Sequence, residues 1–403
     1  MKIAHVITRL IVGGAQENTI LTCAGLAARG HDVTLIAGPE TGPEGSLWNR
    51  AEDCGTRLIR VHSLRRNVHP LFDIRCAREL RAIFHEHAFD VVHTHSSKAG
   101  IVGRWAAHHA PAPALIRPFV VHTIHGMSFN RTQGPARRYL YRFLERRAAR
   151  WTHAFVSVAD AMTAQAVAAG IAERSRFVTI RSGLETKLYQ PDTQQRRAAR
   201  AAWNVPDDSV VVGTIARLFR NKGYEHLLRA LPAIVRACPQ ARFVWVGDGP
   251  NRPDYMAQLN RLGLADRVHL TGLVPPAEIP RLLCGFDLLV HASLWEGLPR
   301  ALVQAALTEV AAVSFDNDGA PEVIDDGRTG SLVPAGDCNA LADRVIALCN
   351  DPAQREHMGR RARTRCLEEF SHHRMVEEIE KLYHRRDGSK RKRPVPSQEP
   401  SSL

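Results

Sequence analysis

Long hydrophobic runs and paired cysteines are both missing from this chain of 403 residues. No apolar stretch approaches the ~18 residues that a membrane span needs. The first ten residues, MKIAHVITRL, run straight into a strand-like segment without the apolar region and cleavage site of a signal peptide, so we expect a cytoplasmic protein. The eight cysteines include no C-x-x-C pair, which favours buried thiols in a reducing compartment over disulfides or a zinc site.

Several functional signatures are missing as well. Neither half offers a complete G-x-G-x-x-G followed about 20 positions later by an acidic residue, as a nicotinamide oxidoreductase would require. No group of His, Asp and Glu residues has convincing metal spacing. The acidic triplet Asp316-Asn317-Asp318 is discounted, because two Asp among three residues arise often by chance in polar loops. No nucleic-acid-binding module is present, so nucleic acid is not an expected partner.

The size and charge of the chain are informative. A chain of 403 residues can form two α/β domains, each with its own core, and its hydrophobic content of 44% is ordinary for a globular protein. The formal net charge is +13. Residues 1–190 hold 25 Lys and Arg against 14 Asp and Glu, whereas residues 191–370 hold 21 against 22. This uneven distribution predicts an anionic partner at the first domain only.

Strand and helix patterns alternate in both halves of the chain. Such alternation is typical of parallel, doubly wound sheets, and the pattern restarts after a polar, Arg-rich stretch near 183–206. We therefore predict an α/β fold of two Rossmann-like domains that face a cleft, at 1–190 and 200–370, with a last helix at 374–386 and a disordered basic tail at 387–403. The predicted strands are 2–8, 33–37, 90–95, 119–124, 210–216, 242–246, 268–271, 287–291 and 311–315, and the predicted helices include 15–29, 72–87 and 223–237.

Two short segments next to predicted strands could bind phosphate. Gly13 and Gly14 lie between the first strand and the first helix, where a helix N-terminus can hold an anion, although glycines in that turn can also be purely steric. Arg217 and Lys222, in RLFRNKG, flank the start of another helix. Two cations placed in this way form a diphosphate clamp, and the alternative is a pair of surface residues with partners elsewhere.

Histidines and carboxylates at strand ends are the other candidates. His125, in VVHTIHGMSF, follows a strand, a position that suits a group that holds a sugar or accepts a proton. His93 and His95 could meet an acceptor or could equally be structural. Glu296 lies in an open turn, WEGLP, between a strand and a helix, where its carboxylate can accept hydrogen bonds from two adjacent hydroxyls.

Taken in order, these motifs resemble the glycosyltransferase family 4 pattern over nearly the whole chain. The matching strings are the GG loop, HTHSSKAG, HTIHG, IRSGLET, RLFRNKG, VGDGP, WEGLP, GAPE, GRTGSLVP and FSHHRMVEEIEKLY. The resemblance implies a GT-B architecture in which segment 371–386 crosses back to the first domain. It also implies a retaining sugar transfer without a metal cofactor, in which the first domain binds the acceptor and the second a nucleoside-diphosphate sugar.

The resemblance also implies roles for individual residues. As catalytic residues it gives His125, Glu296, Arg217 and Lys222, where the two cations neutralise the leaving diphosphate and Glu296 contacts the donor sugar. The donor-binding set is Gly13, Gly14, Arg217, Lys222, Gly247, Leu273, Glu296, Gly297, Leu298 and Gln304.

One position departs from the family pattern. The family has a second Glu eight residues after the first, which holds the ribose hydroxyls, and this chain has Gln304 there. We expect an active enzyme with donor binding weakened by roughly 1–3 kcal/mol, or about tenfold to hundredfold. The alternative is that Gln304 is an ordinary polar residue early in a helix.

A basic segment of the sequence predicts where the protein binds its acceptor. Residues 131–151, RTQGPARRYLYRFLERRAARW, form an amphipathic helix pattern with many arginines, and KRKR at 390–393 adds a polybasic tail. An ordinary core helix with a solvated basic face would show the same sequence pattern. The functional interpretation is attachment to the anionic inner face of a membrane.

We therefore expect a transferase that moves a hexosyl or N-acetylhexosaminyl group from a UDP donor to a glycan or lipid-linked acceptor in cell-surface polysaccharide synthesis. Two alternatives remain. A sugar-nucleotide epimerase of GT-B type would share the donor domain but need no second sugar. A catalytically impaired nucleotide-sugar-binding homologue would be compatible with Gln304.

Overall fold

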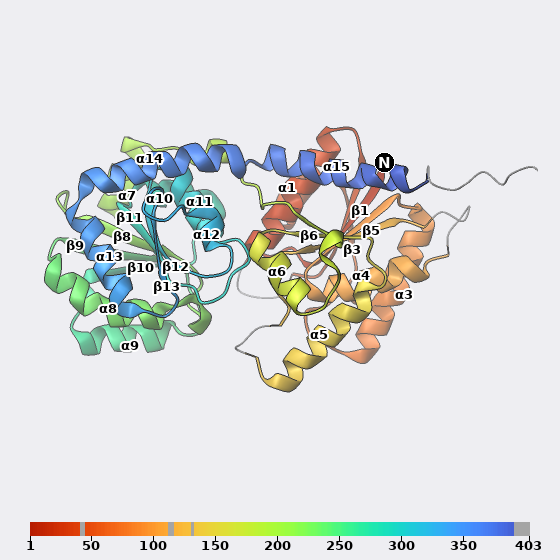
Figure 1. Cartoon of the computed structure of the whole chain (residues 1–403), viewed down its shortest axis with the longest axis horizontal. Helices are drawn as coiled ribbons and strands as arrows, with labels where there is room; N and C mark the ends of the chain where they lie inside the picture. Colours follow the sequence, from red (N-terminus) through yellow and green to blue (C-terminus); the bar gives the residue numbers. More distant parts are fainter. Residues whose placement is uncertain (41–44, 112–116, 130–132, 391–403) are drawn as a thin grey trace, which may run out of the picture.

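The computed structural model describes residues 1–40, 45–111, 117–129 and 133–390, which fold into two α/β lobes side by side (Figure 1). Each lobe is built on one sheet. The first sheet has seven strands in the order β3-β2-β1-β4-β5-β6-β7, and the second has six in the order β10-β9-β8-β11-β12-β13. Every strand pair in both sheets is parallel, so the prediction of two doubly wound parallel-sheet domains is confirmed.

The first lobe alternates strands with helices from its first residues. Its central strands are buried on both faces, as expected for a parallel sheet covered by helices on both sides. The strands are β1 (Lys2–Arg9), β2 (Asp32–Gly38), β3 (Arg57–Arg60), β4 (Val91–His95), β5 (Phe119–Ile124), β6 (Ala154–Ser157) and β7 (Phe177–Thr179). The helices are α1 (Gly14–Ala28), α2 (Trp48–Glu52), α3 (Pro70–His87), α4 (Ser97–His109), α5 (Pro135–Ala149) and α6 (Asp160–Ala168).

The second lobe repeats this alternation. Its strands are β8 (Val210–Ile215), β9 (Ala241–Val246), β10 (Val268–Gly272), β11 (Leu288–His291), β12 (Ala311–Asp316) and β13 (Ser331–Pro334). Its helices are α7 (Thr193–Ala202), α8 (Tyr224–Ala237), α9 (Arg252–Leu262), α10 (Ile279–Cys284), α11 (Arg300–Leu307), α12 (Ala320–Val323), α13 (Cys338–Asn350) and α14 (Pro352–Glu369). The last helix, α15 (His372–Lys390), follows α14 directly.

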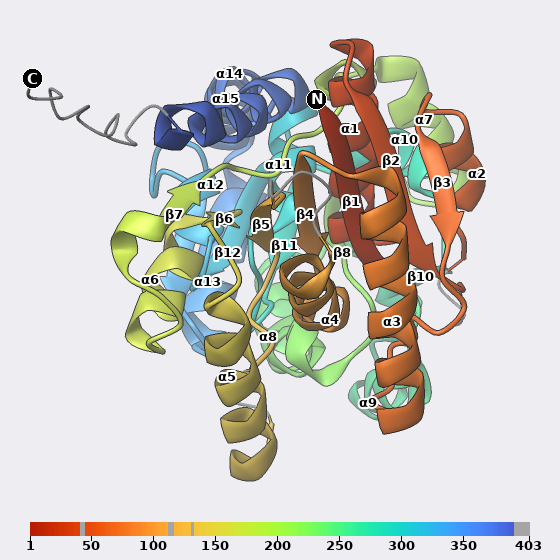
Figure 2. The same cartoon turned by 90° about the vertical axis from the view of Figure 1, so that its right-hand side faces the viewer.

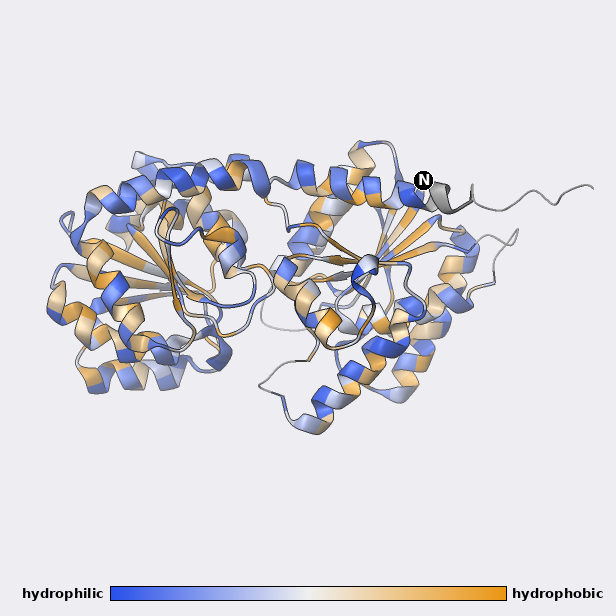
Figure 3. Cartoon of the chain, viewed as in Figure 1, coloured by the Kyte–Doolittle hydropathy of each residue, from blue (hydrophilic) through white to orange (hydrophobic). Residues whose placement is uncertain are grey.

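Helices cover both faces of each sheet, and the apolar residues concentrate on the strands between them (Figure 3). In the first lobe, α3, α4 and α5 pack next to one another on one face (Figure 2), while α1 and α15 cover the other. A further apolar cluster joins the lobes, because it contains Ile124 and Phe155 of the first together with Leu298 and Ala320 of the second. The two lobes therefore share part of their buried core.

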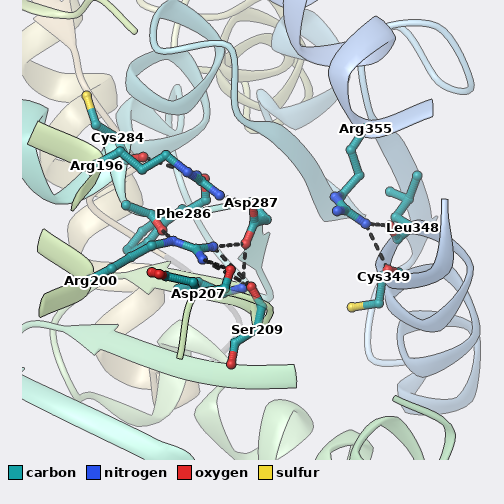
Figure 4. A network of polar contacts seen from close by, with 12 residues as sticks. Arg196, Arg200, Asp207, Ser209, Cys284, Phe286, Asp287, Leu348, Cys349 and Arg355 are labelled. Atoms are coloured by element: carbon teal, nitrogen blue, oxygen red, sulfur yellow. Dashed lines mark hydrogen bonds and ion pairs between the residues drawn. The ribbon is translucent and has the colours of Figure 1, made fainter. Parts of the chain in front are cut away.

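The chain crosses between the lobes twice. After the first crossing, α7 is anchored to the second lobe by Asp287, which precedes β11 (Figure 4). Asp287 accepts hydrogen bonds from Arg196 Nη2 at 2.6 Å, from Arg200 and from Val211 N at 2.7 Å. The second crossing leads from α14 to α15, which packs against α1 of the first lobe (Figure 1).

The C-terminal boundary differs from the sequence prediction. Helix α15 continues to Lys390, so residues 387–390 are helical rather than part of a disordered tail from 387. Residues 391–403, with most of the KRKR motif, lie outside the described residues, as do Arg131 and Thr132 at the start of the basic segment. Among the helices that the structure describes, none is long and apolar enough to cross a membrane.

Candidate functional site: a cleft between the two lobes

The cleft between the lobes, with a volume of about 580 Å³, receives side chains from both. It is lined by the loops that follow the strands, the usual ligand position in open parallel sheets. The structure brings together in this cleft every residue assigned to the site from the sequence, namely Gly13, Gly14, His125, Arg217, Lys222, Gly247, Leu273, Glu296, Gly297, Leu298 and Gln304. His93 and His95 do not line it and are buried within the first lobe.

The two cations of the second lobe lie between β8 and α8. Lys222 ends a 3-10 turn (Arg220–Lys222), and Gly223 follows with a φ of +78°. A Cβ on Gly223 would lie 1.8 Å from the carbonyl oxygen of Ala292, so only glycine fits where this loop meets the end of β11. Lys222 Nζ donates to Glu296 Oε1 at 2.5 Å, and this contact links the pair of cations to the WEGLP turn.

Glu296 is held by charge and by hydrogen bonds. Its backbone N–H donates to Asp318 Oδ2 at 2.8 Å, and His291 Nε2 lies 3.5 Å from Oε1. Burial raises the pKa of Glu296, but Lys222 and then His291 outweigh this effect and hold the pKa well below its usual range. The carboxylate is therefore ionised at neutral pH and can accept hydrogen bonds from sugar hydroxyls.

The turn after Glu296 sits directly on the first lobe. A Cβ on Gly297 would lie 2.0 Å from the backbone oxygen of His125. Gln165 Nε2 donates across the lobes to Asp318 Oδ1 at 2.7 Å. Asp318, from the acidic triplet that we discounted as a metal motif, thus joins the lobes and fixes the turn that carries Glu296.

Gln304 lies one turn into α11 and faces the cleft. Its Nε2 donates to the hydroxyl of Tyr189 at 2.8 Å, and Tyr189 is buried. This hydrogen bond leaves Oε1 as the acceptor that the amide can offer to a ligand.

His125 reaches the cleft from the end of β5. Its Nε2 lies 3.1 Å from Nδ1 of His95, so Nδ1 is the ring nitrogen left for a ligand. Burial and, less strongly, the Arg300 guanidinium lower the pKa of His125 to about 3, and the imidazole is neutral at neutral pH.

Sequence reasoning missed several cleft residues. Arg300 Nη2 donates to Glu17 Oε2 at 2.8 Å, and this ion pair joins α11 to the first turn of α1 across the cleft. A Cβ on Gly14 would lie 2.6 Å from Cδ of Arg300, so a small residue there admits the arginine. Arg300 directly follows WEGLP, and that position is the only sequence signal for it. Among the ionisable side chains of the cleft, sequence reasoning also missed Arg9, Arg66 and His291.

One group of side chains could ligate a metal by position. Among the described residues, His5, His93 and His95 place one ring nitrogen each within 4.8 Å of the others. The sequence had shown no such group, because His5 is far from the other two along the chain. All three are buried.

Two family models match the chain. Residues 195–365 match the group 1 glycosyl transferases, and residues 13–183 match the glycosyl transferase 4-like domain. The UDP-Gal:α-D-GlcNAc-diphosphoundecaprenol α-1,3-galactosyltransferase of Escherichia coli is 26% identical over 389 residues, which cover 95% of this chain and 96% of the relative. The putative glycosyltransferase EpsD of Bacillus subtilis is 26% identical, covering 76% of this chain and 79% of the relative.

Solved structures share the arrangement of the two lobes. Anabaena Alr3699/HepE in complex with UDP and glucose superposes with a TM-score of 0.81 at 22% identity, over 96% of this chain and 100% of that one. The sucrose-phosphate synthase of Thermosynechococcus elongatus gives a TM-score of 0.81 at 20% identity, with the same coverage. Both likenesses concern the fold.

Proposed function

This chain belongs to the glycosyltransferases of GT-B type that combine a group 1 domain with a GT4-like domain, and we propose the reaction that it catalyses. The reaction is transfer of a hexosyl or N-acetylhexosaminyl group from a UDP-sugar, with retention of the anomeric configuration, to a glycan or lipid-linked acceptor of cell-surface polysaccharide synthesis. Support for UDP comes from the E. coli relative, which uses UDP-Gal, and from the Anabaena structure, which holds UDP.

The observation that carries the proposal is the convergence of Arg217, Lys222 and Glu296 in one cleft. Cleavage of a sugar–diphosphate bond develops negative charge on the departing diphosphate, which two fixed cations stabilise more strongly in the transition state than in the ground state. Glu296, ionised and held by Lys222, offers its carboxylate to the sugar hydroxyls. With the charge neutralised by side chains, this mechanism needs no metal ion.

His125 completes the proposed site from the first lobe. Because its imidazole is neutral and its Nδ1 is left for the cleft, it can donate or accept one hydrogen bond with the transferred sugar or the incoming hydroxyl. Leu273, which is 54% exposed at the edge of the cleft, supplies an apolar surface for the nucleotide base.

The clamp is tested by single substitutions. Arg217→Ala and Lys222→Ala should each lower kcat at least about hundredfold with the fold intact, because the leaving group loses a cation. Arg220→Ala is the matched control, since Arg220 belongs to the same loop but is not part of the cleft lining. Turnover near the wild-type rate in both clamp variants would contradict the assignment.

The same assay separates the alternatives. An epimerase would convert the UDP-sugar without any acceptor, whereas a transferase releases UDP in proportion to the acceptor consumed. A non-catalytic homologue would bind the donor and release nothing.

We further propose that the first lobe reaches its acceptor at an anionic membrane surface. Three large apolar side chains on α5 are exposed, namely Tyr139 (74%), Leu140 (50%) and Phe143 (53%). Val68, Leu71 and Ile74, before and within the start of α3, are exposed as well. Exposed arginines at 137, 138, 146, 147 and 150 accompany them. Apolar side chains among cations suit a surface of anionic lipid.

A small apolar groove lies between α3, α4 and α5. It has a volume of about 170 Å³ and is lined by Ala77, Ile101, Val102, Trp105, Leu144, Arg147 and Trp151 of α3, α4, α5 and the residues after α5. Its chemistry suits part of a lipid chain, in keeping with a lipid-linked acceptor.

Vesicle binding tests the membrane proposal. Binding should rise with the fraction of anionic lipid and weaken with salt, and Phe143→Ser should reduce it. Leu262→Ser, at a residue of the second lobe that is 43% exposed, is the matched control. Equal binding to neutral and anionic vesicles would refute the proposal and favour a soluble acceptor.

A further inference from the structure

Strand pairing gathers polar residues on one face of the first sheet. His5 of β1 pairs with His93 of β4, and His95 of β4 pairs with Thr123 of β5. Because side chains alternate along a strand, His93 and His95 point to the same face, and His125 follows Thr123 there. This is the face that α1 and α15 cover, and α15 adds Tyr383, which is fully buried.

These six side chains form one continuous chain of hydrogen bonds. From the cleft inward, His125 Nε2 lies 3.1 Å from His95 Nδ1, and His95 Nε2 lies 2.9 Å from His5 Nδ1. The Tyr383 hydroxyl then lies 3.4 Å from His5 Nε2 and 2.5 Å from His93 Nδ1. His93 Nε2 ends the chain at Thr123 Oγ1, at 2.6 Å.

When the buried Tyr383 hydroxyl donates its proton to one of the two histidines beside it, this hydrogen-bond chain has two self-consistent arrangements of its protons. A neutral imidazole has one N–H donor and one acceptor nitrogen, and His95, His5 and His93 each use both nitrogens. Burial first, with weaker effects of neighbouring histidines at His93 and His95, lowers the pKa of all three, so they are neutral. As long as Tyr383 donates within this hydrogen-bond chain, a change of tautomer at one ring requires every other ring to change with it.

Hydrogen bonding also accounts for the cluster that could by position hold a metal. No ring nitrogen of His5, His93 or His95 is among the buried polar atoms without a partner in the described part of the chain. A cation there would have to break these bonds in a site without any carboxylate.

We propose that this chain of hydrogen bonds positions His125, so that Tyr383, His5 and His95 fix which nitrogen of His125 carries its proton and how its ring faces the cleft. These three are positioning residues, since none of them lines the cleft. The expected effect on kcat rests on the proposed function of the cleft, whereas the expected effect on the His125 tautomer does not.

The first experiment needs no activity. Nitrogen-15 NMR of histidine-labelled protein, with the His125 signals assigned by their loss in His125→Gln, reports the tautomer directly. We expect a single neutral tautomer in the wild type and a mixture in both Tyr383→Phe and His95→Leu. His95→Gln, whose amide can donate and accept, should restore the single form. Unchanged His125 signals in Tyr383→Phe and His95→Leu would overturn the proposal.

The second experiment measures kinetics. Tyr383→Phe and His95→Leu should lower kcat about tenfold to hundredfold, the effect of one lost buried hydrogen bond, with little change in the dissociation constant of UDP. His122→Gln is the matched control, because buried His122 bonds Thr94 instead of the chain. An equal loss of kcat in the control would show a merely structural role. One equivalent of transition metal in the purified protein, released by chelators, would also overturn the proposal.

If the cleft is not a transferase site, neither the wild type nor any variant will transfer sugar. The NMR experiment will still test the effect of the hydrogen-bond chain on the His125 tautomer. The failure of the inference and the failure of the proposed function are therefore distinguishable.

Discussion

Gln304→Glu is the substitution that most directly tests how this site differs from its family. Gln304 lies in the cleft on α11 and donates to Tyr189, so only its amide oxygen is left to accept from a ligand. A carboxylate at the same position would accept from Tyr189 and from ribose hydroxyls with charge-assisted hydrogen bonds.

The surroundings can accommodate the added charge. Arg300 lies four residues earlier on the same helix, a spacing that places the two side chains on one face. Among the described residues its Nη1 is buried without a partner, although Nη2 is paired with Glu17. Exchanging a neutral acceptor for a charged one should then strengthen binding of the nucleotide by roughly 1–3 kcal/mol, or about tenfold to hundredfold.

Calorimetric titration with UDP measures the effect, and 2′-deoxy-UDP identifies its source. We expect Gln304→Glu to lower the dissociation constant for UDP by that factor, with a smaller gain for the deoxy analogue. Gln304→Leu, which removes both polar atoms, should weaken binding. An equal gain for both nucleotides would refute the ribose contact. If neither the wild type nor Gln304→Glu binds any nucleotide, the transferase function fails as well.

Two further predictions concern stability. Asp287→Ala should lower the free energy of unfolding by about 3 kcal/mol, because buried Arg200 loses its anion. The control is Asp266→Ala, at a residue whose side chain is 77% exposed, which should change the free energy of unfolding by less than about 0.5 kcal/mol. Equal urea midpoints for the two variants would contradict this prediction. Acid should destabilise the protein below about pH 6.5, because the unfolded chain takes up protons that buried His5 and His125 do not accept until about pH 3, at up to about 1.4 kcal/mol per group and pH unit. Burial lowers the pKa of His93, His95 and His122 as well, so these three act in the same direction. Urea titrations from pH 7 to 5 should therefore show falling stability, and a flat profile would contradict this.

The central strands and the cleft loops were predictable because their signals are local. A parallel strand covered on both faces is a short apolar run, and 119–124 was predicted with the bounds that the structure gives β5. The motif residues follow strand ends, and parallel sheets place all such ends at one edge. That geometry explains why Arg217, after β8, and Glu296, after the neighbouring β11, meet in one cleft.

The elements that were missed have weaker patterns. Strands β6 and β7 have four and three residues, too few for any periodicity to stand out. Helix α4 buries Gly100 and Gly103 and even Arg104, so its buried face does not read as apolar. Arg104 is compensated by an ion pair with Glu145 of α5 at 2.6 Å, a partner that only the fold reveals.

Contacts between segments far apart in the sequence could not be predicted from local patterns either. Nothing local connects Glu17 with Arg300, or His5 with Tyr383, since each pair depends on how strands are ordered and how the chain crosses between lobes. His5 sits in the apolar middle of β1, where a single histidine gives no sign that two more lie on the neighbouring strand.

The crossing helix shows why the first lobe cannot be understood as residues 1–190 alone. Five side chains of α15, namely Met375, Val376, Ile379, Leu382 and Tyr383, are buried in the core between α1 and the first sheet. At about 1.5–3 kcal/mol for each buried side chain, they contribute roughly 7–15 kcal/mol, as much as the whole stability of a typical domain. The sulfur of Met375 also accepts from Gly183 N at 3.1 Å, where the chain first leaves the lobe. The C-terminal segment therefore completes the first lobe, and the helix that completes it is the one that supplies Tyr383 to the hydrogen-bond chain behind His125.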